Sequence, residues 1–378
     1  MKKSKNVKDP LHISEGGLTK LALQKFKKNF WGVLSFCFLV CCLFIAVFAY
    51  YLAPDDSKNA NQMHLSIHSK SPGFKVTMLV IPSNDEKSNS TISDFFFGKN
   101  TSATEIPISK YLISHGGIVV NEYQTEGIGL EKKYDLSYFP KAKSTTDIER
   151  LYLEEKKFYL GTDKYGRDLL SRMLIGIRIS LSIGFVAVFI SLLIGITLGA
   201  LAGYFGGKVD ALIMWFINVT WSIPTLLLVI AITLALGKGF WQVFIAVGLT
   251  MWVEVARIVR GQVKQHKERQ FVVAANVMDF NDFRIITKHI LPNIVSTLIV
   301  ISAANFAASI LIESGLSFPG LGAQPPMTSW GLMIKDHYNY IILGEPFLAI
   351  IPGLCIMLLV SAFMILGNSL RDILDVRN

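Results

Sequence analysis

Residues 179–204 read ISLSIGFVAVFISLLIGITLGALAGY, a run of 26 residues without a charged side chain. A helix needs about 20 mostly apolar residues to cross the hydrocarbon core of a bilayer. This stretch is long enough, and it predicts an integral membrane protein. The composition agrees, because 51% of the 378 residues are hydrophobic and only 17% are charged, against about 25% in soluble domains. A disordered or fibrous chain is excluded, and a wholly soluble enzyme is disfavoured.

Five further stretches meet the same criterion, so the sequence predicts six membrane-spanning helices. In chain order, the six candidates are residues 30–52, 179–204, 211–236, 240–259, 294–312 and 347–366. The first is too long for the apolar core of a signal peptide and lacks a small-residue cleavage site, so we expect it to be retained. The predicted fold class is therefore all-α, with one N-terminal span before a five-helix core. Pro224 is expected to kink the third span.

Lysine and arginine predict the orientation of these spans, because positive charges collect in short cytoplasmic loops. Residues 1–29 contain eight lysines, and the outside turn between spans three and four carries only Lys238. The loop between spans four and five carries six cations, which are Arg260, Lys264, Lys267, Arg269, Arg284 and Lys288. Both termini and this loop are therefore expected in the cytoplasm. The net charge of +9 is consistent with this bias.

The spans divide the chain into four segments. These are a cytoplasmic segment at 1–29, a first span at 30–52, an exoplasmic insertion at 53–177, and a five-helix core at 178–378 that contains the cytoplasmic loop 260–291. The insertion is polar and has strand-like runs, which are residues 74–81, 117–120 and 156–160. Its size allows a small β-rich domain, and a partly ordered spacer is the alternative.

The cysteines and histidines predict neither a metal site nor a disulfide. Three cysteines lie in the first apolar run and Cys355 lies in the last, where a thiol behaves as a small hydrophobic group. No Cys-x-x-Cys or Cys/His ligand set occurs. The histidines of the insertion, His64, His68 and His115, are scattered. We also find no nucleophile–base spacing or paired carboxylates, so no catalytic residue is expected.

Four glycines recur every four residues, which places them on one stripe of the second span: Gly195, Gly199, Gly203 and Gly207. Glycine lets another helix approach closely. We therefore predict a helix-packing surface, with a moving contact during transport as the alternative.

The cytoplasmic loop contains QFVVAANVMDFNDFRIITKHILPN at residues 270–293. This sequence predicts two short helices separated by a turn, with Asn281 as the N-cap and Asp282 at the positive helix start. Ala274 and Ala275 would together give a smooth surface against which a partner protein could press. An amphipathic helix lying on the membrane surface is the alternative that the pattern allows.

The same loop resembles the EAA loop of bacterial ABC-importer permeases, which reads Glu-Ala-Ala, then Gly, and later Leu-Pro. Val273 stands where Glu is usual and Asp279 where Gly is usual; Asp tolerates a left-handed backbone, so we expect the turn to persist. Because the Glu is absent, the resemblance does not imply an ion pair with the ATPase at that position. The resemblance implies that an ATPase couples to Val273, Ala274, Ala275, Asp279, Asn281, Arg284, Leu291 and Pro292.

Three other stretches resemble the C-type permease subunit of dipeptide and oligopeptide importers. They are LGTDKYGRDLLSRMLIGIRISL at 160–181, LSFPGLGAQPPMTSWG at 316–331 and LGNSLRDILD at 366–375. Pro319 replaces a usual Leu and Asn368 a usual Asp. The resemblance covers about 160–378 and the first span, whereas the insertion matches nothing in the family pattern.

This resemblance implies a permease subunit in a bacterial inner membrane. Such a subunit pairs with a second homologous permease, two cytoplasmic ATPases dock on the loops, and an external binding protein delivers peptide. ATP and magnesium would bind in the ATPases, because this chain has no GxxxxGK[ST] phosphate loop. We therefore expect no cofactor and no enzymatic activity in this chain, and no nucleic-acid partner.

Polar residues of the spans are candidates to face the translocation pathway: Asn218, Trp221, Asn305 and Glu313. Hydrogen bonding between helices is the alternative for the two asparagines, and snorkelling or backbone pairing for Glu313. Glu254 is expected to form an ion pair with Arg257 or Arg260.

The motif before the second span would lie at the outer mouth, where the resemblance implies contact with the binding protein: Asp163, Gly166, Arg167 and Asp168. Exposed local ion pairs, which contribute little to stability, are the alternative for its charges.

Other functions also remain open. The cargo could be a nickel chelate, because related systems share these motifs. The chain could instead be a membrane-anchored enzyme or sensor that uses the insertion. An export-type or degenerate assembly that signals through ATPases is a third alternative, suggested by the departures at Val273 and Asp279.

Overall fold

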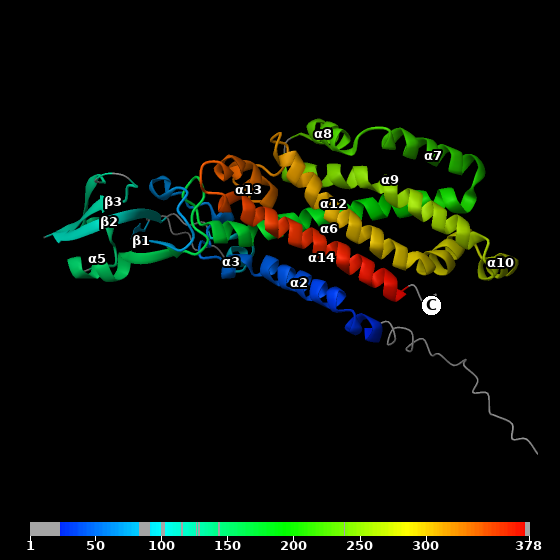
Figure 1. Cartoon of the computed structure of the whole chain (residues 1–378), viewed down its shortest axis with the longest axis horizontal. Helices are drawn as coiled ribbons and strands as arrows, with labels where there is room; N and C mark the ends of the chain where they lie inside the picture. The colour runs from blue at the N-terminus through cyan, green and yellow to red at the C-terminus, as the bar shows by residue number, and fades with distance from the viewer. Residues whose placement is uncertain are drawn as a thin grey trace, which may run out of the picture.

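A computed structural model gives the architecture of the chain. It describes residues 23–82, 91–99, 103–114, 116–125, 127, 129–142, 144–237 and 239–374. Most of the predicted cytoplasmic segment 1–29, His115, Lys238 and the last residue of the 366–375 motif therefore lie outside the described residues. The molecule is elongated, with a small sheet at one end and a helical bundle that extends from it (Figure 1).

Long apolar helices build the bundle: α2 (Phe30–Val47), α6 (Leu169–Phe205), α9 (Phe240–Lys267), α12 (Val295–Ser317) and α14 (Phe347–Leu374). Among the described residues, five continuous helical segments are long and apolar enough to cross a membrane, and one of them runs unbroken from Asp282 to Ser317. The short α3 (Ala49–Leu52) follows α2, and α13 (Trp330–His337) lies before α14. These five segments confirm five of the predicted spans.

The third predicted span is the exception. Residues 211–236 do not form one helix, because α7 (Gly207–Trp221) and α8 (Thr225–Leu236) meet at an angle of 92°. Pro224 has no N–H to donate and disfavours helical backbone in the residue before it, so helix α7 ends ahead of it and α8 begins after it. The predicted kink is thus a complete break, and the pair counts as a sixth span only if both helices belong to it.

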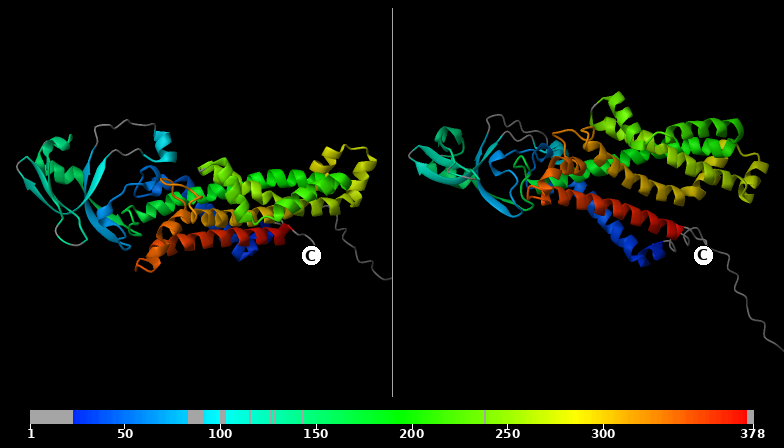
Figure 2. Two further views of the ribbon diagram at one scale, coloured as in Figure 1. Left: turned by 90° about the horizontal axis from the view of Figure 1, so that it is seen from above. Right: turned by 45° about the horizontal axis from the view of Figure 1, so that its top comes forward.

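Helix α6 is the central helix of the bundle. The Asp168 side chain caps it by accepting a hydrogen bond from the Ser171 N–H at 2.8 Å. It packs against α9 along one side and against α12 and α2 on others, and α2 lies beside α14 (Figure 2). Lipid tails are as apolar as these side chains, so close packing and hydrogen bonds must hold the helices together.

The residues between α2 and α6 contain a five-stranded antiparallel sheet in the order β4-β3-β2-β1-β5. The strands are β1 (Phe74–Ile81), β2 (Thr104–Ser114), β3 (Gly117–Glu122), β4 (Glu131–Asp135) and β5 (Leu153–Phe158). Helix α4 (Thr91–Phe97) lies between β1 and β2, and α5 (Thr145–Tyr152) packs on the sheet through Ile148 and Tyr152. A small sheet is therefore present in the insertion.

Two strands of this sheet were not predicted. Strand β4 is charged and lies at the edge of the sheet, so it carries no hydrophobic alternation. Strand β2 contains Pro107 and changes register between Ile108 and Lys110, which interrupts its period of two. By contrast, the predicted run 74–81 has the same bounds as β1.

Candidate functional site

Helix α10 (Gln270–Val277) lies at the end of the bundle opposite the sheet (Figure 1). Asp279 follows it with φ of 55°, the left-handed conformation predicted for this turn. The Asn281 side chain then accepts a hydrogen bond from the Arg284 N–H at 3.2 Å and caps α11 (Asp282–Arg284). Both the turn and the N-cap are confirmed.

The two alanines of α10 do not share a surface. Ala275 is buried with Val272 in a cluster that includes Val263 and Ile285, whereas Ala274 is exposed. Neighbouring residues on a helix point about 100° apart, so an adjacent pair cannot both face a partner while the helix packs on the bundle. The prediction of a joint Ala274–Ala275 surface is therefore wrong.

The exposed face of α10 and its flanks is mostly apolar. We define the coupling ridge as the exposed residues Val273, Ala274, Val277, Met278 and Phe283. Val277 is 82% exposed and Phe283 is 74% exposed. A large apolar side chain in water is unfavourable by about 1.5–3 kcal/mol relative to burial. The ridge therefore presents a surface suited to contact with another protein.

The remaining residues of the loop connect α10 to the bundle. Arg284 stacks over the Phe280 ring at 4.2 Å from its centroid, and Pro292 lies in the first turn of a 3₁₀ segment, Leu291–Ile294, that leads into α12. Leu291 packs against the same buried cluster as Ala275. Asp279 and Asn281 are exposed and form the turn itself. The eight residues implied by the resemblance thus divide between an exposed face and an anchoring region.

Polar contacts tie this region to α6 and α9. The Tyr204 hydroxyl of α6 donates to an Asp282 carboxylate oxygen at 2.8 Å. Lys267, the last residue of α9, donates to the Tyr204 carbonyl oxygen at 2.6 Å. The Phe280 and His289 rings stack at 5.8 Å between centroids. Together with the buried side chains of Val272 and Ala275, these contacts hold the loop against the ends of α6 and α9.

Three of the four predicted packing glycines lie at the contact between α6 and α9. A Cβ atom at Gly195 would approach the Val255 Cβ to 2.5 Å, and one at Gly203 would approach the Arg260 carbonyl oxygen to 2.7 Å. Gly199 lies between them and faces Ala256. Gly207 does not belong to the stripe, because it begins α7 with φ of 52°, and a Cβ atom there would meet no neighbouring atom within 4 Å.

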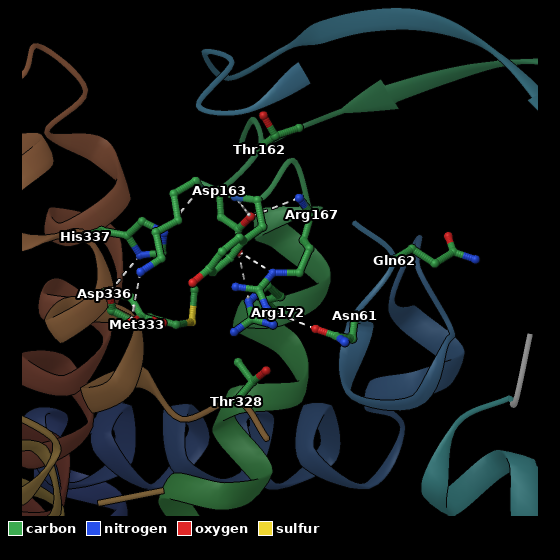
Figure 3. Close-up of polar contacts among 12 residues, drawn as sticks. Asn61, Gln62, Thr162, Asp163, Arg167, Arg172, Thr328, Met333, Asp336 and His337 are labelled. Atoms are coloured by element: carbon green, nitrogen blue, oxygen red, sulfur yellow. Dashed lines mark hydrogen bonds and ion pairs between the residues drawn. The ribbon is translucent and has the colours of Figure 1, made fainter. Parts of the chain in front are cut away.

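The motif before α6 forms a buried joint with α13, which we call the outer joint (Figure 3). Its members are Asp163, Lys164, Arg167, Arg172, Asp336 and His337. Arg167 Nε lies 2.6 Å and Arg172 Nε 3.4 Å from Asp163 Oδ2. Lys164 Nζ lies 3.2 Å from Asp336 Oδ1, which links this loop to α13. Arg167 also donates to Asn61 at 3.0 Å.

Burial changes the interpretation of this motif. Asp163, Arg167 and Asp168 are at most 4% exposed, so neither exposed ion pairs nor direct contact with a binding protein fits these side chains. Gly166 is required for backbone reasons: its φ is +73° and the His64 carbonyl oxygen occupies the space of a Cβ atom. Both sequence interpretations of the motif are therefore wrong, and its residues join the inserted region to the bundle.

Burial also shifts two pKa values here. Burial raises the pKa of Asp168, and its hydrogen bonds with Ser171 only partly offset the effect. Burial lowers the pKa of His337, against the opposing hydrogen bond with the Met333 carbonyl oxygen. The Lys164 N–H points at His337 Nε2 at 3.4 Å, which requires that nitrogen to be unprotonated. His337 is therefore neutral at pH 7.

The predicted pathway residues are not brought together. Asn305 is buried and donates to Ser191 at 3.5 Å. Glu313 is fully buried and accepts from Ser329 at 2.8 Å and Ser317 at 3.2 Å, so it neither snorkels nor faces an open path. Asn218 accepts a hydrogen bond from Arg257 at 3.1 Å. The centroid of the Trp221 ring lies 3.5 Å from the same guanidinium carbon. Interhelical contact is thus the observed arrangement for these side chains.

The expected pairing of Glu254 is also wrong. Arg257 contacts α7 as just described, and Arg260 forms a 2.5 Å ion pair with Asp210 of the same helix. Both arginines therefore point toward α7. Glu254 instead lines a groove of about 1060 Å³ between α9, α12 and the end of α14. Its other polar residues, among them Gln262, Ser296 and Thr297, were not predicted.

Two models of known protein families match this chain. Residues 195–378 match the family model "binding-protein-dependent transport system inner membrane component". Residues 17–72 match "N-terminal TM domain of oligopeptide transport permease C".

Individual relatives are similar over the core. The chain is 42% identical over 217 residues to the glutathione transport system permease protein GsiD of Pectobacterium atrosepticum, covering 57% of this chain and 72% of the relative. It is 42% identical over 217 residues to the dipeptide transport system permease protein DppC of Bacillus subtilis, covering 57% and 68%. It is 40% identical over 244 residues to the oligopeptide transport system permease protein OppC of Haemophilus influenzae, covering 64% and 78%.

The two family matches include α2 and the helices from α7 to α14. The relatives align over more than two thirds of their own length. The chain therefore belongs to the binding-protein-dependent inner membrane components, the permease subunits of ABC importers, and it is a multi-pass membrane protein rather than an enzyme.

Proposed function

We propose that this chain is the C-type permease of an importer for dipeptides or oligopeptides. The observation that carries the proposal is the identity of about 40% to permeases named for glutathione, dipeptides and oligopeptides. These three cargoes are all peptides with charged termini. A zwitterion of this kind cannot cross hydrocarbon unaided, because a charge in the bilayer is costly.

The proposed orientation places α10 and both ends of the chain in the cytoplasm. The start of α2, the end of α14 and α10 lie toward the same end of the molecule, opposite the sheet (Figure 1). The cations of the α9–α12 loop lie at that end too, in agreement with positive charges collecting on the cytoplasmic side. The sheet would then lie outside, where a binding protein delivers cargo.

The coupling ridge is the proposed docking surface for an ATPase subunit. Its apolar side chains suit burial in a cleft of the partner, and its anchoring residues make α10 part of a rigid unit with α6, α9 and α12. ATP and magnesium would bind in two such ATPases. Closure of the ATPases would then push α10 and shift a two-state helix bundle between inward and outward openings. A second permease would complete the pathway.

Uptake of a labelled dipeptide tests the proposed cargo. A strain that lacks only this gene is complemented with the wild-type chain or with an empty vector, and ATP-dependent uptake is measured in the presence of the binding protein. We expect the wild-type chain to restore uptake, and competition by unlabelled peptide to suppress it. Equal uptake with and without the chain, together with restored uptake of a nickel chelate, would contradict the peptide assignment.

A further inference from the structure

The groove beside α10 is lined by polar side chains from two candidate membrane spans. Glu254 lies within the candidate span Trp241–Lys267, and Ser296 and Thr297 lie within the candidate span Asp282–Ser317. All three line the same hollow of about 1060 Å³. Hydrocarbon offers no hydrogen bonds, so polar groups of two spans that face one groove indicate contact with water or with a polar solute.

Glu254 has no charged partner within the described part of the chain. It is exposed, and among the described residues no cation lies within ion-pair distance of its carboxylate. The nearest arginines along α9, Arg257 and Arg260, contact Asn218 and Asp210 on α7 instead. An unpaired carboxylate within a membrane span is costly unless it meets water or a cation. The groove is where such a cation would arrive.

The groove also carries the opposite charge. Arg269 and Arg371 line it, and they come from the α9–α10 junction and from the end of α14. A solute in the groove would thus meet an acidic group from α9 and basic groups from these two helix ends. Opposite charges at two positions suit a molecule with an ammonium group and a carboxylate at its ends.

We propose that this groove is the chain's wall of the translocation pathway and that Glu254 binds the α-ammonium group of the passing peptide. The inference rests on the proposed function. The route passes the α9–α12 face rather than the predicted set of Asn218, Trp221, Asn305 and Glu313, whose polar atoms are engaged between helices or buried.

The first arm of the test measures uptake. The chain is reconstituted in liposomes with its partner permease, ATPases and binding protein, and free dipeptide uptake is compared for wild type, Glu254→Gln and Glu254→Asp. Loss of a charge-assisted hydrogen bond predicts about tenfold slower uptake for Glu254→Gln, with recovery to within about threefold for Glu254→Asp. Glu268→Gln is the matched control, because Glu268 ends the same helix outside the groove, and it should leave uptake unchanged.

The second arm measures water access. In a variant with the native cysteines replaced by alanine, Thr297→Cys should react with a membrane-impermeant thiol reagent in inside-out vesicles. Leu358→Cys, an exposed apolar position of α14 outside the groove, should not. Co-purification of each variant with the partner permease and the ATPases separates a pathway role from a defect in assembly.

The outcomes divide cleanly. Wild-type uptake by Glu254→Gln overturns the role of Glu254, and an unreactive Thr297→Cys overturns the water-filled groove. A wild-type complex that moves no peptide overturns the proposed function and with it the ammonium assignment, while a reactive Thr297→Cys still supports a water-filled groove. Slow uptake with Glu254→Gln, recovery with Glu254→Asp and a reactive Thr297→Cys support the proposal.

Discussion

Replacing Gly199 with alanine tests whether close approach of α6 and α9 holds the bundle together. A Cβ atom at this position would lie 2.5 Å from the Ala256 carbonyl oxygen and 2.8 Å from the Val259 Cβ. Two non-bonded heavy atoms reach their preferred separation only at about 3.5 Å. The two helices must therefore move apart by about 1 Å. The obstructing oxygen belongs to the backbone and cannot turn away.

The expected loss follows from a matched control on α9. Gly261 has no atom within 4 Å of a Cβ position, so Gly261→Ala adds no contact. Both substitutions gain the same helix propensity, about 1 kcal/mol, which cancels when the two variants are compared. The remaining difference in the free energy of unfolding is the cost of overpacking at Gly199, about 1–3 kcal/mol. Gly199→Ala should therefore be less stable than Gly261→Ala by that amount.

Denaturant unfolding of the purified chain in detergent measures the difference. The order of stability should be Gly261→Ala above Gly199→Ala, with a gap of about 1–3 kcal/mol. Equal stability of the two variants would refute the idea that the glycine contact is needed. A variant Gly207→Ala serves as a second check, because any loss there comes from its φ of 52° and not from packing.

Two further predictions concern buried charge outside the spans. Asp163→Ala should destabilise the chain by about 3–5 kcal/mol, because it leaves buried guanidinium groups without their counter-charge. Asp135→Ala is the control: it removes an exposed ion pair with Lys133 and should cost about 1 kcal/mol or less in the same unfolding assay. Comparable losses would count against the buried joint. Burial alone would raise the pKa of Glu105, but His64 at 3.3 Å and Lys156 at 2.8 Å outweigh it and hold the pKa at about 2. A lowered pKa stabilises the fold above the usual value of 4.5, and this stabilisation is lost as the pH falls toward 2. Thermal midpoints should therefore drop more steeply below about pH 4.5 in wild type than in Glu105→Gln, and parallel curves would contradict the pairing.

Local patterns predicted the parts of the fold that depend on neighbouring residues. The apolar runs indicated five of the spans because hydropathy over about 20 residues is a local property. The turn at Asp279, the Asn281 cap and strand β1 were likewise predictable from short stretches. In each case the residues that decide the structure are close in sequence.

The features that sequence did not predict depend on distant partners. Arg260 pairs with Asp210, fifty residues earlier, and this choice leaves Glu254 free to face the groove. Lys164 meets Asp336 across 172 positions, so the burial of the outer joint could not be inferred from the motif alone. The inward face of Ala275 depends on how α10 packs against the bundle, which the alanine pair does not reveal.

Site-directed cross-linking at Val277 tests whether the coupling ridge contacts an ATPase subunit. Val277→Cys in a chain without native cysteines, coexpressed with its ATPases, should form a disulfide or short cross-link to an ATPase subunit that carries cysteines in its docking cleft. Ile342→Cys is the control, because that side chain is 90% exposed and comes from the segment between α13 and α14. We expect a cross-linked product for Val277→Cys, with a yield that changes on ATP binding, and none for Ile342→Cys. An ATPase that cross-links to neither position, or to Ile342→Cys instead, would contradict the coupling ridge.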